Sequence, residues 1–258
     1  VPLYRLEQDF SRYGLSITRQ NMANWMIRLG ESYLAILYDY LHQKLYDYHV
    51  IQADETPVLV NRDGRPAGSK SYMWVYRSGH LYKDKQIVLY DYHKTRNSSH
   101  PREFLKNYSG ICVTDGYQVY HKVEKEREDL RIAGCWVHAR RKFDEAMNVV
   151  PKEQRKKSNA YLVMKQIQAI YREEGQGKLQ ELSPDERLMQ RQLVIKPLVD
   201  ALFVYLKKME PTVPSNGHLR KAYTYILNQE KYLRVFLEDG EVPIDNNASE
   251  RAIRGFCI

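Results

Sequence analysis

The sequence predicts a mixed α/β protein with a large added helical region, and three observations support this. Short β-branched and aromatic runs occupy much of residues 49–138, where they alternate with helical stretches. Residues 1–48 and 151–238 carry instead the apolar spacing of three and four residues that is typical of amphipathic helices. With 43% hydrophobic residues, the 258-residue chain has enough apolar side chains to bury the core that such a fold needs.

Residues 1–48 are predicted to be helical, with a break at Gly14-Leu15-Ser16 between two amphipathic stretches. This arrangement resembles a helix-turn-helix. Two core-packing helices joined by a short turn explain the same pattern, because the turn alone is a weak signal.

Five strands are expected in the next hundred residues, and their order predicts the sheet. The runs are HVIQADETPVLV, SYMWVYRS, QIVLYDYH, GICVTDGY and RIAGCWVH, at residues 49–60, 71–78, 86–93, 110–117 and 131–138. Ser99 as an N-cap and Pro101 in the first turn predict a helix between the third and fourth runs. Further helices are expected after Asp115-Gly116 and from Ala139. Hairpin-connected strands followed by βα units imply a mixed sheet with helices on its faces.

Residues 151–240 are predicted to form a helical region inserted before a final helix. Ser183 and Glu186 have the spacing of a capping box, and Pro197 is expected to kink or interrupt the helix that follows. The final segment contains IDNNASERAIR, in which Asn247 is expected to cap a helix that carries Glu250. We therefore divide the chain into residues 1–48, 49–150, 151–240 and 241–258.

The composition narrows the class of protein. Lys plus Arg (40) exceed Asp plus Glu (32) by eight, and the sequence pI is about 9.2. This modest excess of positive charge is weak support for a polyanionic partner such as nucleic acid, because it also serves solubility. No apolar run is long enough to span a bilayer, so we expect a soluble protein without membrane contact, and the small number of cysteines predicts a reducing cytoplasm. The chain begins Val1-Pro2, without Met, and we expect a fragment of a longer protein. The three cysteines form no CxxC pair, which argues against a disulfide scaffold and a zinc finger: Cys112, Cys135 and Cys257.

Three acidic residues are the strongest candidates for chemistry. Asp54 and Asp115 each follow an apolar run and are expected at strand ends, where ligand sites of mixed sheets lie. Taken singly, each has a structural explanation: the aspartates as turn residues, and Glu250 as a capping partner that also pairs with Arg254. Together, two strand-end aspartates and a helical glutamate can bind Mg²⁺ or Mn²⁺ through their oxygens.

Other polar residues near these carboxylates have two interpretations each. Cys135-x-x-His138 supplies only two of the four ligands that zinc needs, so we expect His138 to order the site or to contact the substrate bound there. Trp136 either stacks on a base or belongs to the core. The basic residues are candidates for phosphate contacts, with a solvated helix face as the alternative for the first three: Arg140, Arg141, Lys142, Arg251 and Arg254.

The combined motifs resemble a known family. ADETPV, TDGYQVY, AGCWVHARRKF and IDNNASERAIR are similar, in this order, to the signatures of the IS-sixty-six family of bacterial insertion-sequence transposases. The resemblance implies a DDE transposase with a ribonuclease H-like mixed sheet in residues 49–150 and a last catalytic helix in residues 241–258. It also implies that Asp54, Asp115 and Glu250 bind two Mg²⁺ (or Mn²⁺) ions, with Asp245 as the reserve acidic candidate.

The implied function is DNA transposition in the bacterial cytoplasm. Such an enzyme is a polynucleotidyl transferase that cleaves DNA phosphodiesters at the element's ends and joins them to target DNA, without a covalent protein intermediate. Its partners would be double-stranded DNA of the ends and target, together with further copies of itself on DNA. The chain lacks the N-terminal metal-binding extension and the basic segment after the ER motif of the family, so we expect end recognition to be missing from it.

Two alternatives remain open from the residues alone. His138-x-x-Arg141 and 21 tyrosines also fit a metal-independent tyrosine recombinase, with Tyr223 or Tyr225 as nucleophile. A non-catalytic, basic DNA-binding fragment would use the same acidic residues only as caps.

Overall fold

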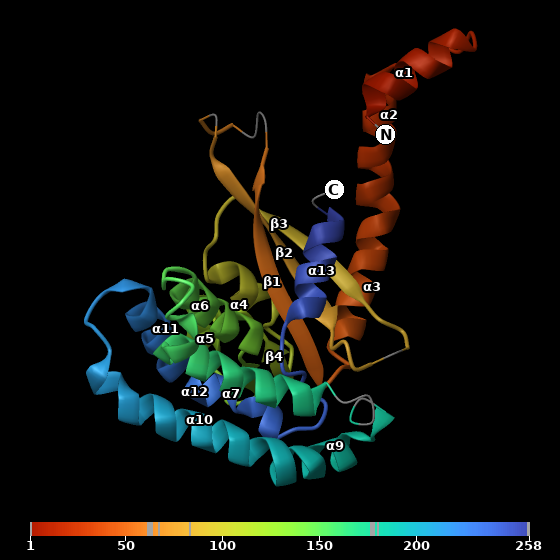
Figure 1. The fold of residues 1–258 in the computed structure, drawn as a ribbon. Coiled ribbons are helices and arrows are strands. Elements are labelled where there is room, and N and C mark those ends of the chain that lie inside the picture. Colours follow the sequence, from red (N-terminus) through yellow and green to blue (C-terminus); the bar gives the residue numbers. More distant parts are fainter. Residues whose placement is uncertain are drawn as a thin grey trace. The chain divides into compact units, whose positions relative to one another are not determined.

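The computed structural model describes residues 2–60, 64–66, 68–82, 84–175, 179 and 181–256, so Cys257 lies outside the described residues. The chain divides into two compact units, one ending at Asp47 and the other starting at Tyr48. Figure 1 shows the elements of both units. None of the described helices is long and apolar enough to cross a membrane.

The first unit is helical, as predicted. Helix α1 spans Leu3–Arg12 and α2 spans Arg19–Leu29, and a π-helical turn (Gly30–Leu34) leads directly into α3 (Ala35–Leu45). The break between α1 and α2 coincides with the predicted Gly14-Leu15-Ser16 and uses a positive φ of 78° at Gly14. Thr18 begins α2, because its side chain accepts a hydrogen bond of 3.2 Å from the Asn21 amide.

The second unit contains a five-stranded mixed sheet, which confirms the predicted α/β class. Its order is β3-β2-β1-β4-β5, in which β1, β2 and β3 are antiparallel and β1, β4 and β5 are parallel. All five predicted runs form strands: β1 (Val50–Leu59), β2 (Lys70–Ser78), β3 (Val88–His93), β4 (Gly110–Val113) and β5 (Leu130–Ala133).

Strand β1 corrects the expected position of Asp54, which lies in the middle of the strand and not at its end. The reason is the unequal pairing of β1 with its two neighbours. Its parallel pairing with β4 stops at Gln52, whereas the antiparallel pairing with β2 continues to Leu59. Asp54 therefore lies just past the point where the parallel part of the sheet ends, which is where a ligand site of such a sheet is expected.

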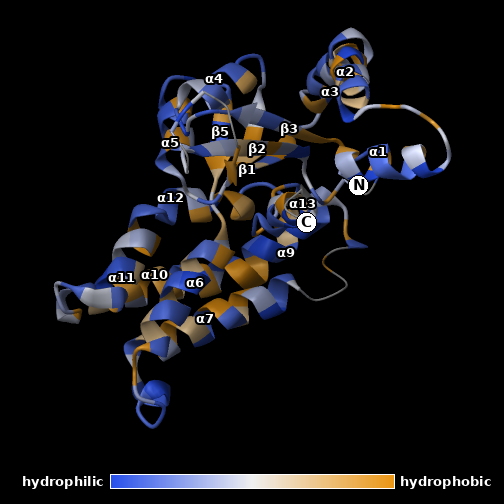
Figure 2. Ribbon diagram, turned by 90° about the horizontal axis from the view of Figure 1, so that it is seen from above, coloured by the Kyte–Doolittle hydropathy of each residue, from blue (hydrophilic) through white to orange (hydrophobic). Residues whose placement is uncertain are grey.

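Helices cover both faces of the sheet (Figure 2). Helices α4 (Ser99–Phe104) and α5 (Gln118–Lys125) lie on one side, and α6 (Trp136–Asn148) lies on the other with the helical region. Two predicted boundaries were wrong. The N-cap of α4 is Ser98, and the Asn97 side chain accepts a bond of 2.9 Å from the Ser99 amide. Because β5 ends early, His138 lies in the first turn of α6 and not on a strand.

The helical region contains α7, α9, α10, α11 and α12, at Asn159–Glu174, Pro184–Gln190, Lys196–Met209, Gly217–Asn228 and Glu230–Leu233. Single turns of 3-10 helix occur at Arg155–Lys157, Glu210–Thr212 and Val235–Leu237. The predicted capping box of Ser183 and Glu186 is present. The irregularity expected at Pro197 is a π-helical turn, Arg191–Ile195, just before it, since Pro197 has no amide to donate. Helix α13 (Asn247–Phe256) follows and packs against β1 and β2.

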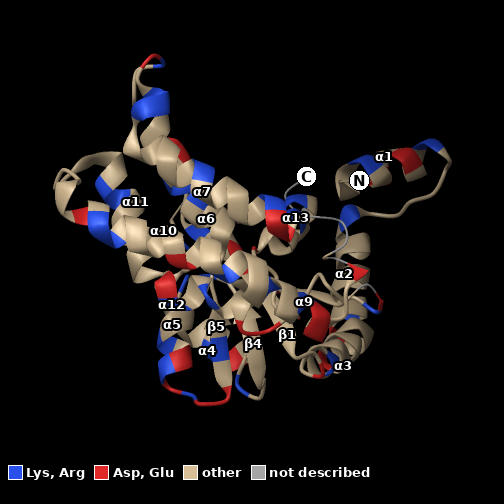
Figure 3. Ribbon diagram, turned by 60° about the horizontal axis from the view of Figure 1, so that its bottom comes forward, with Lys and Arg blue, Asp and Glu red and all other residues tan. Residues whose placement is uncertain are grey.

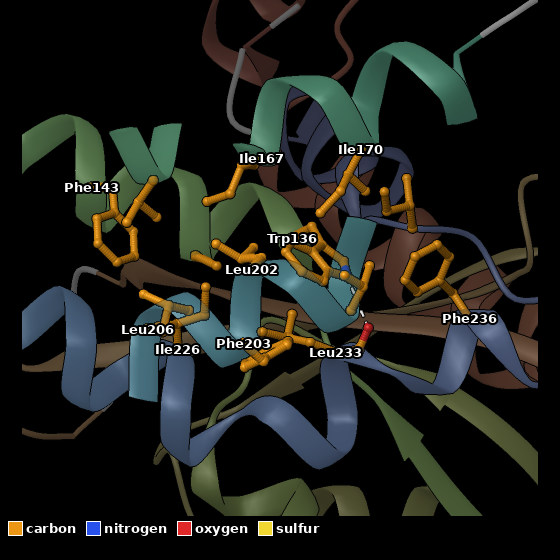
Figure 4. Packing of buried hydrophobic residues seen from close by; sticks show 14 of the residues in the cluster. Trp136, Phe143, Ile167, Ile170, Leu202, Phe203, Leu206, Ile226, Leu233 and Phe236 are labelled. Atoms are coloured by element: carbon orange, nitrogen blue, oxygen red, sulfur yellow. Dashed lines mark hydrogen bonds between the residues drawn. The ribbon is translucent and has the colours of Figure 1, made fainter. Parts of the chain in front are cut away.

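The core lies between the sheet and the helical region (Figure 4). Trp136 is fully buried there, and its indole nitrogen donates a bond of 2.9 Å to the carbonyl of Leu233. Its ring meets those of Phe203 and Phe236 edge to face. Burial of a side chain of this size stabilises the fold by about 2–3 kcal/mol. Trp136 is therefore a core residue, and the alternative of stacking on a DNA base was wrong.

Candidate active site

The start of α13 is tied to β1 through Asn246. This buried side chain donates a bond of 2.8 Å to the carbonyl of Ala53 and accepts one of 3.1 Å from Gln52. Its backbone amide donates to the sulfur of Cys135 at 3.2 Å. Burial raises the pKa of that thiol to about 12, so Cys135 acts here as a neutral acceptor. These bonds fix the segment that carries Glu250 beside the middle of β1.

Asp54 is buried in the middle of β1, where its Oδ1 accepts a bond of 2.9 Å from the Glu55 amide. Burial, together with the negative charges of Asp115, Glu55 and Glu250, raises its pKa to about 8. The charges of Asp115 and Glu250, separated in sequence by 61 (115 − 54) and a further 135 (250 − 115) positions, thus both affect the carboxyl group of Asp54.

Asp115 follows β4, as predicted, and its side chain also has a structural role. Its Oδ1 accepts a bond of 2.9 Å from the Tyr117 amide, and Gly116 has a φ of 90°, so the expected turn is present. The hydroxyl of Tyr225 donates a hydrogen bond of 2.8 Å to the Asp115 carbonyl. The turn leaves the carboxylate near enough to Asp54 and Glu55 to raise their pKa values.

Glu250 lies in the first turn of α13, where its side chain is 18% exposed. Its Oε1 accepts from Arg141 at 3.3 Å and lies 3.8 Å from Nε2 of His138. The predicted pairing with Arg254 was wrong: within the described residues the ion pairs of Glu250 are with α6, because the tertiary fold brings that helix closer.

His138 is mostly buried beside the carboxylates. Burial lowers the pKa of its imidazole, and the charge of Asp115 acts in the opposite direction. Its Nδ1 is buried and has no hydrogen-bond partner in the described part of the chain. His138 is thus near both Asp115 and Glu250 with one ring nitrogen uncommitted.

The residues that could bind a metal are brought near each other without forming a closed ligand set. Among the residues the structure describes, no three His, Cys, Asp or Glu side chains are arranged to hold a metal ion. Asp54 and Asp115 offer oxygen donors of the kind that Mg²⁺ and Mn²⁺ prefer, and the pKa of Asp54 is raised by burial and by neighbouring negative charge that a cation would neutralise. Glu250 is held instead by Arg141 and would have to leave it to join them.

The side chain of Asp245, the reserve acidic candidate, forms hydrogen bonds at the N-terminus of α13. Its Oδ1 accepts from the Asn247 amide and its Oδ2 from the Asn247 side chain, both at 3.0 Å. The backbone carbonyl of Asn246 accepts from the amide of Glu250, so Asn246 is the N-cap by position, and the cap predicted for Asn247 was wrong. Burial raises the pKa of Asp245.

The predicted basic residues divide between α6 and α13 (Figure 3). Arg140 and Arg141 line a depression of about 440 Å³ between α6 and α7, and the Arg140 guanidinium lies 5.6 Å from the ring of Tyr171. Lys142 pairs with Glu145 at 3.6 Å. Arg251 and Arg254 are exposed on α13.

Sequence reasoning missed a group next to Asp54. Glu55 has a side chain only 1% exposed and pairs with Arg96, whose guanidinium stacks 3.8 Å from the ring of Tyr117. Glu55 was visible as the second acidic residue of ADETPV, whereas nothing in the local pattern singles out Arg96, which lies in the loop between β3 and α4.

Comparison with known proteins gives the family. The family model described as Transposase IS66 family matches residues 1–258. Two proteins of Sinorhizobium fredii (strain NBRC 101917 / NGR234) are similar over nearly the whole chain: uncharacterized protein y4qI is 30% identical over 98% of this chain and 47% of its own length, and uncharacterized protein y4jD is 26% identical over 100% and 50%. The chain thus spans about half the length of the curated relatives it matches. The match over all 258 residues shows that this chain belongs to the IS66 family of transposases.

Proposed function

We propose that this chain is the catalytic region of a DDE transposase that cleaves DNA at insertion-sequence ends and transfers the strands to target DNA. Membership of the transposase family supports the class of reaction. The antiparallel β3-β2-β1 hairpins followed by parallel β4 and β5, with helices on both faces, support a ribonuclease H-like core. The activity, its DNA partners and self-association on DNA are proposed for the longer protein.

The observation that carries the proposal is the position of α13 beside β1, fixed by the bond of 2.8 Å from the Asn246 side chain to the carbonyl of Ala53, the residue before Asp54. The pKa of Asp54 supports it. A carboxyl that burial and three neighbouring carboxylates raise to about 8 is costly to keep ionised without a cation. Such clusters of like charge are common at functional sites, because each acidic group there has a role that outweighs its cost to stability. A DDE site requires acidic residues from β1, from the end of β4 and from α13 to lie close enough to affect one another's charge.

We infer a role for each group of side chains. Asp54 and Asp115 would hold divalent cations, and Glu250 would complete the ligand set once Arg141 releases it. Bound Mg²⁺ or Mn²⁺ supplies Lewis acidity that activates water or a DNA 3′-hydroxyl and stabilises the leaving oxygen. Arg141, freed from Glu250, would pair with a DNA phosphate, as would Arg140, Arg251 and Arg254. His138, whose Nε2 lies 3.8 Å from Oε1 of Glu250, would order the carboxylate site.

The tyrosine-recombinase alternative has less support. Tyr223 is fully buried, and its hydroxyl donates a hydrogen bond of 2.6 Å to the side chain of Asn159. Burial raises the pKa of Tyr223 to about 12. Tyr225 donates to the Asp115 carbonyl, and burial raises its pKa as well. A raised pKa and a committed proton make both hydroxyls poor nucleophiles.

The test is cleavage of DNA that carries the element's ends, with Mg²⁺ or Mn²⁺ or with EDTA. The protein used is the full-length transposase that contains this chain. Asp54→Asn, Asp115→Asn and Glu250→Gln should each lower the cleavage rate by about a thousandfold or more while DNA binding persists. Glu153→Gln is the matched control, because Glu153 is exposed in the turn after α6.

Each alternative gives a different result. Cleavage that survives EDTA and leaves DNA attached to the protein would support the tyrosine mechanism. Unchanged cleavage by any one of the three variants would remove that residue from the triad. DNA binding without cleavage by the unsubstituted protein under every metal condition would favour the non-catalytic alternative.

A further inference from the structure

A second charged group lies beside the carboxylates, in the loop between β3 and α4. Arg96 donates through Nε at 2.8 Å, and also through Nη2, to Oε1 of Glu55. Glu55 directly follows Asp54 on β1, and its other carboxylate oxygen, Oε2, is buried without a hydrogen-bond partner among the described residues. Arg96 is therefore the cation that compensates this buried carboxylate in the described part of the chain.

The guanidinium of Arg96 is also fixed by aromatic rings. It lies 3.8 Å from the ring centre of Tyr117 and 5.9 Å from that of Tyr72. The hydroxyl of Tyr117 donates a hydrogen bond of 3.1 Å to the backbone carbonyl of Arg96, while the backbone amide of Tyr117 donates one to Oδ1 of Asp115. Arg96 is thereby linked to both aspartate positions: through Glu55 to Asp54, and through Tyr117 to Asp115.

One edge of this guanidinium remains available. The bonds to Glu55 use Nε and Nη2, whereas Nη1 has no partner within the described residues, and the side chain is 40% exposed. An arginine held by a buried carboxylate and an aromatic face loses little side-chain entropy on binding. Its planar N–H groups suit phosphate oxygens, so the free edge is a preorganised anion site.

We propose that Arg96 binds a phosphate of the DNA strand that enters the Asp54–Asp115 site, with Glu55 and Tyr117 holding the guanidinium in place. The inference rests on the proposed function, since the phosphate is that of the DNA substrate. The alternative is that Arg96 only neutralises Glu55 and never contacts DNA. The proposal and this alternative predict different numbers of contacts between the protein and DNA phosphates, but the same fold.

The salt dependence of DNA binding measures that number. We would follow the binding of a short labelled duplex to the full-length transposase by fluorescence anisotropy in EDTA, from about 50 to about 200 mM salt. Each phosphate contact contributes about 0.9 to the slope of log K against log salt, so Arg96→Ala should lower the slope by about that amount. An unchanged slope would overturn the proposal.

Three further variants test whether the change in slope comes from a loss of folding or from a general effect of charge. Glu55→Gln retains Arg96 but removes the buried charge, so adding Arg96→Gln to it should again lower the slope by about 0.9. Arg102→Ala is the matched control, because Arg102 also binds a glutamate through two bonds, of 2.8 and 2.7 Å to Glu126, and is similarly exposed. An equal loss in Arg102→Ala would contradict a specific site at Arg96.

The result separates this inference from the proposed function. A normal slope in the Arg96 variants, together with loss of cleavage in Asp54→Asn, would refute only the phosphate site. A reduced slope, together with normal cleavage by Asp54→Asn, would refute the carboxylate mechanism and leave the phosphate contact.

Discussion

The side-chain amide of Asn246 donates a hydrogen bond of 2.8 Å to the carbonyl of Ala53, the residue that precedes Asp54 on β1. This bond joins two segments that are 193 positions apart. Together with the bond from Gln52 to Asn246, it places the helix of Glu250 beside the strand of Asp54. The site therefore depends on a polar contact in which neither partner is a proposed metal ligand.

Replacing this contact should weaken both stability and activity. Asn246→Ala removes the side-chain donor to the buried Ala53 carbonyl and one of the two acceptors of the Gln52 side-chain amide, so the free energy of unfolding should fall by about 2–4 kcal/mol in urea titrations. Cleavage should fall as well, because α13 loses its anchor. Asn107→Ala, at an exposed position, should change stability by less than about 0.5 kcal/mol. A similar effect of both substitutions would contradict the anchoring role.

Arg191 should be the most sensitive residue of the helical region. Its fully buried guanidinium binds Glu174 and the carbonyls of Phe236, Asp239 and Val242, at 2.9–3.0 Å for the carbonyls. Arg191→Met leaves these acceptors unpaired, and we expect a loss of about 3–5 kcal/mol on chemical unfolding. Arg172→Met, which removes an exposed arginine of α7, should cost less than about 0.5 kcal/mol. A small effect at Arg191 would show that water replaces its bonds.

His80 should make the protein sensitive to mild acid. Burial lowers its pKa to about 4 from the ordinary 6.5, and the charge of Arg77 acts in the same direction. Between these values the unfolded chain binds a proton that the folded protein does not, so stability is lost as pH falls from about 6.5 to about 4. The loss should reach at most about 3 kcal/mol.

The measurement is the free energy of unfolding of the protein and of His80→Gln at several pH values. The difference between the two should shrink as pH falls through this range, because glutamine does not titrate. His218→Gln, at an exposed position on α11, should follow the unsubstituted protein. A constant difference between the protein and His80→Gln would argue against a neutral, buried His80.

Arg141 should compete with metal for Glu250. Because Arg141 is 51% exposed, its ion pair with Glu250 contributes no more than about 1 kcal/mol. Arg141→Gln should therefore tighten Mn²⁺ binding by up to about fivefold in calorimetric titrations without DNA. Arg131→Gln removes an arginine that pairs with Glu238, and should leave the affinity unchanged. Weaker Mn²⁺ binding in Arg141→Gln would mean that Arg141 supports the ligand set and does not compete with it.

The predictions from sequence succeeded where a signal is local. All five strands were predicted because β-branched and aromatic runs are bounded by turn residues, and the capping box at Ser183 was predicted because its spacing lies within one helical turn. The errors arose where a neighbour in space decides. Asp54 lies in mid-strand because β2 extends β1, and Glu250 contacts Arg141 because α6 lies closer to it than Arg254 does.

The α/β class, the order of the elements and the family could all be predicted from the residues alone, since these depend on short-range periodicity and on motifs that occur in a fixed order. Which side chains contact one another depends on the tertiary packing. Sheet pairing and the anchor at Asn246 place the strand of Asp54 beside the helix of Glu250, and the fold also pairs Glu55 with Arg96 next to Asp54. Local propensity acts over a few residues, whereas the position of a carboxylate in a site depends on contacts formed across the whole fold.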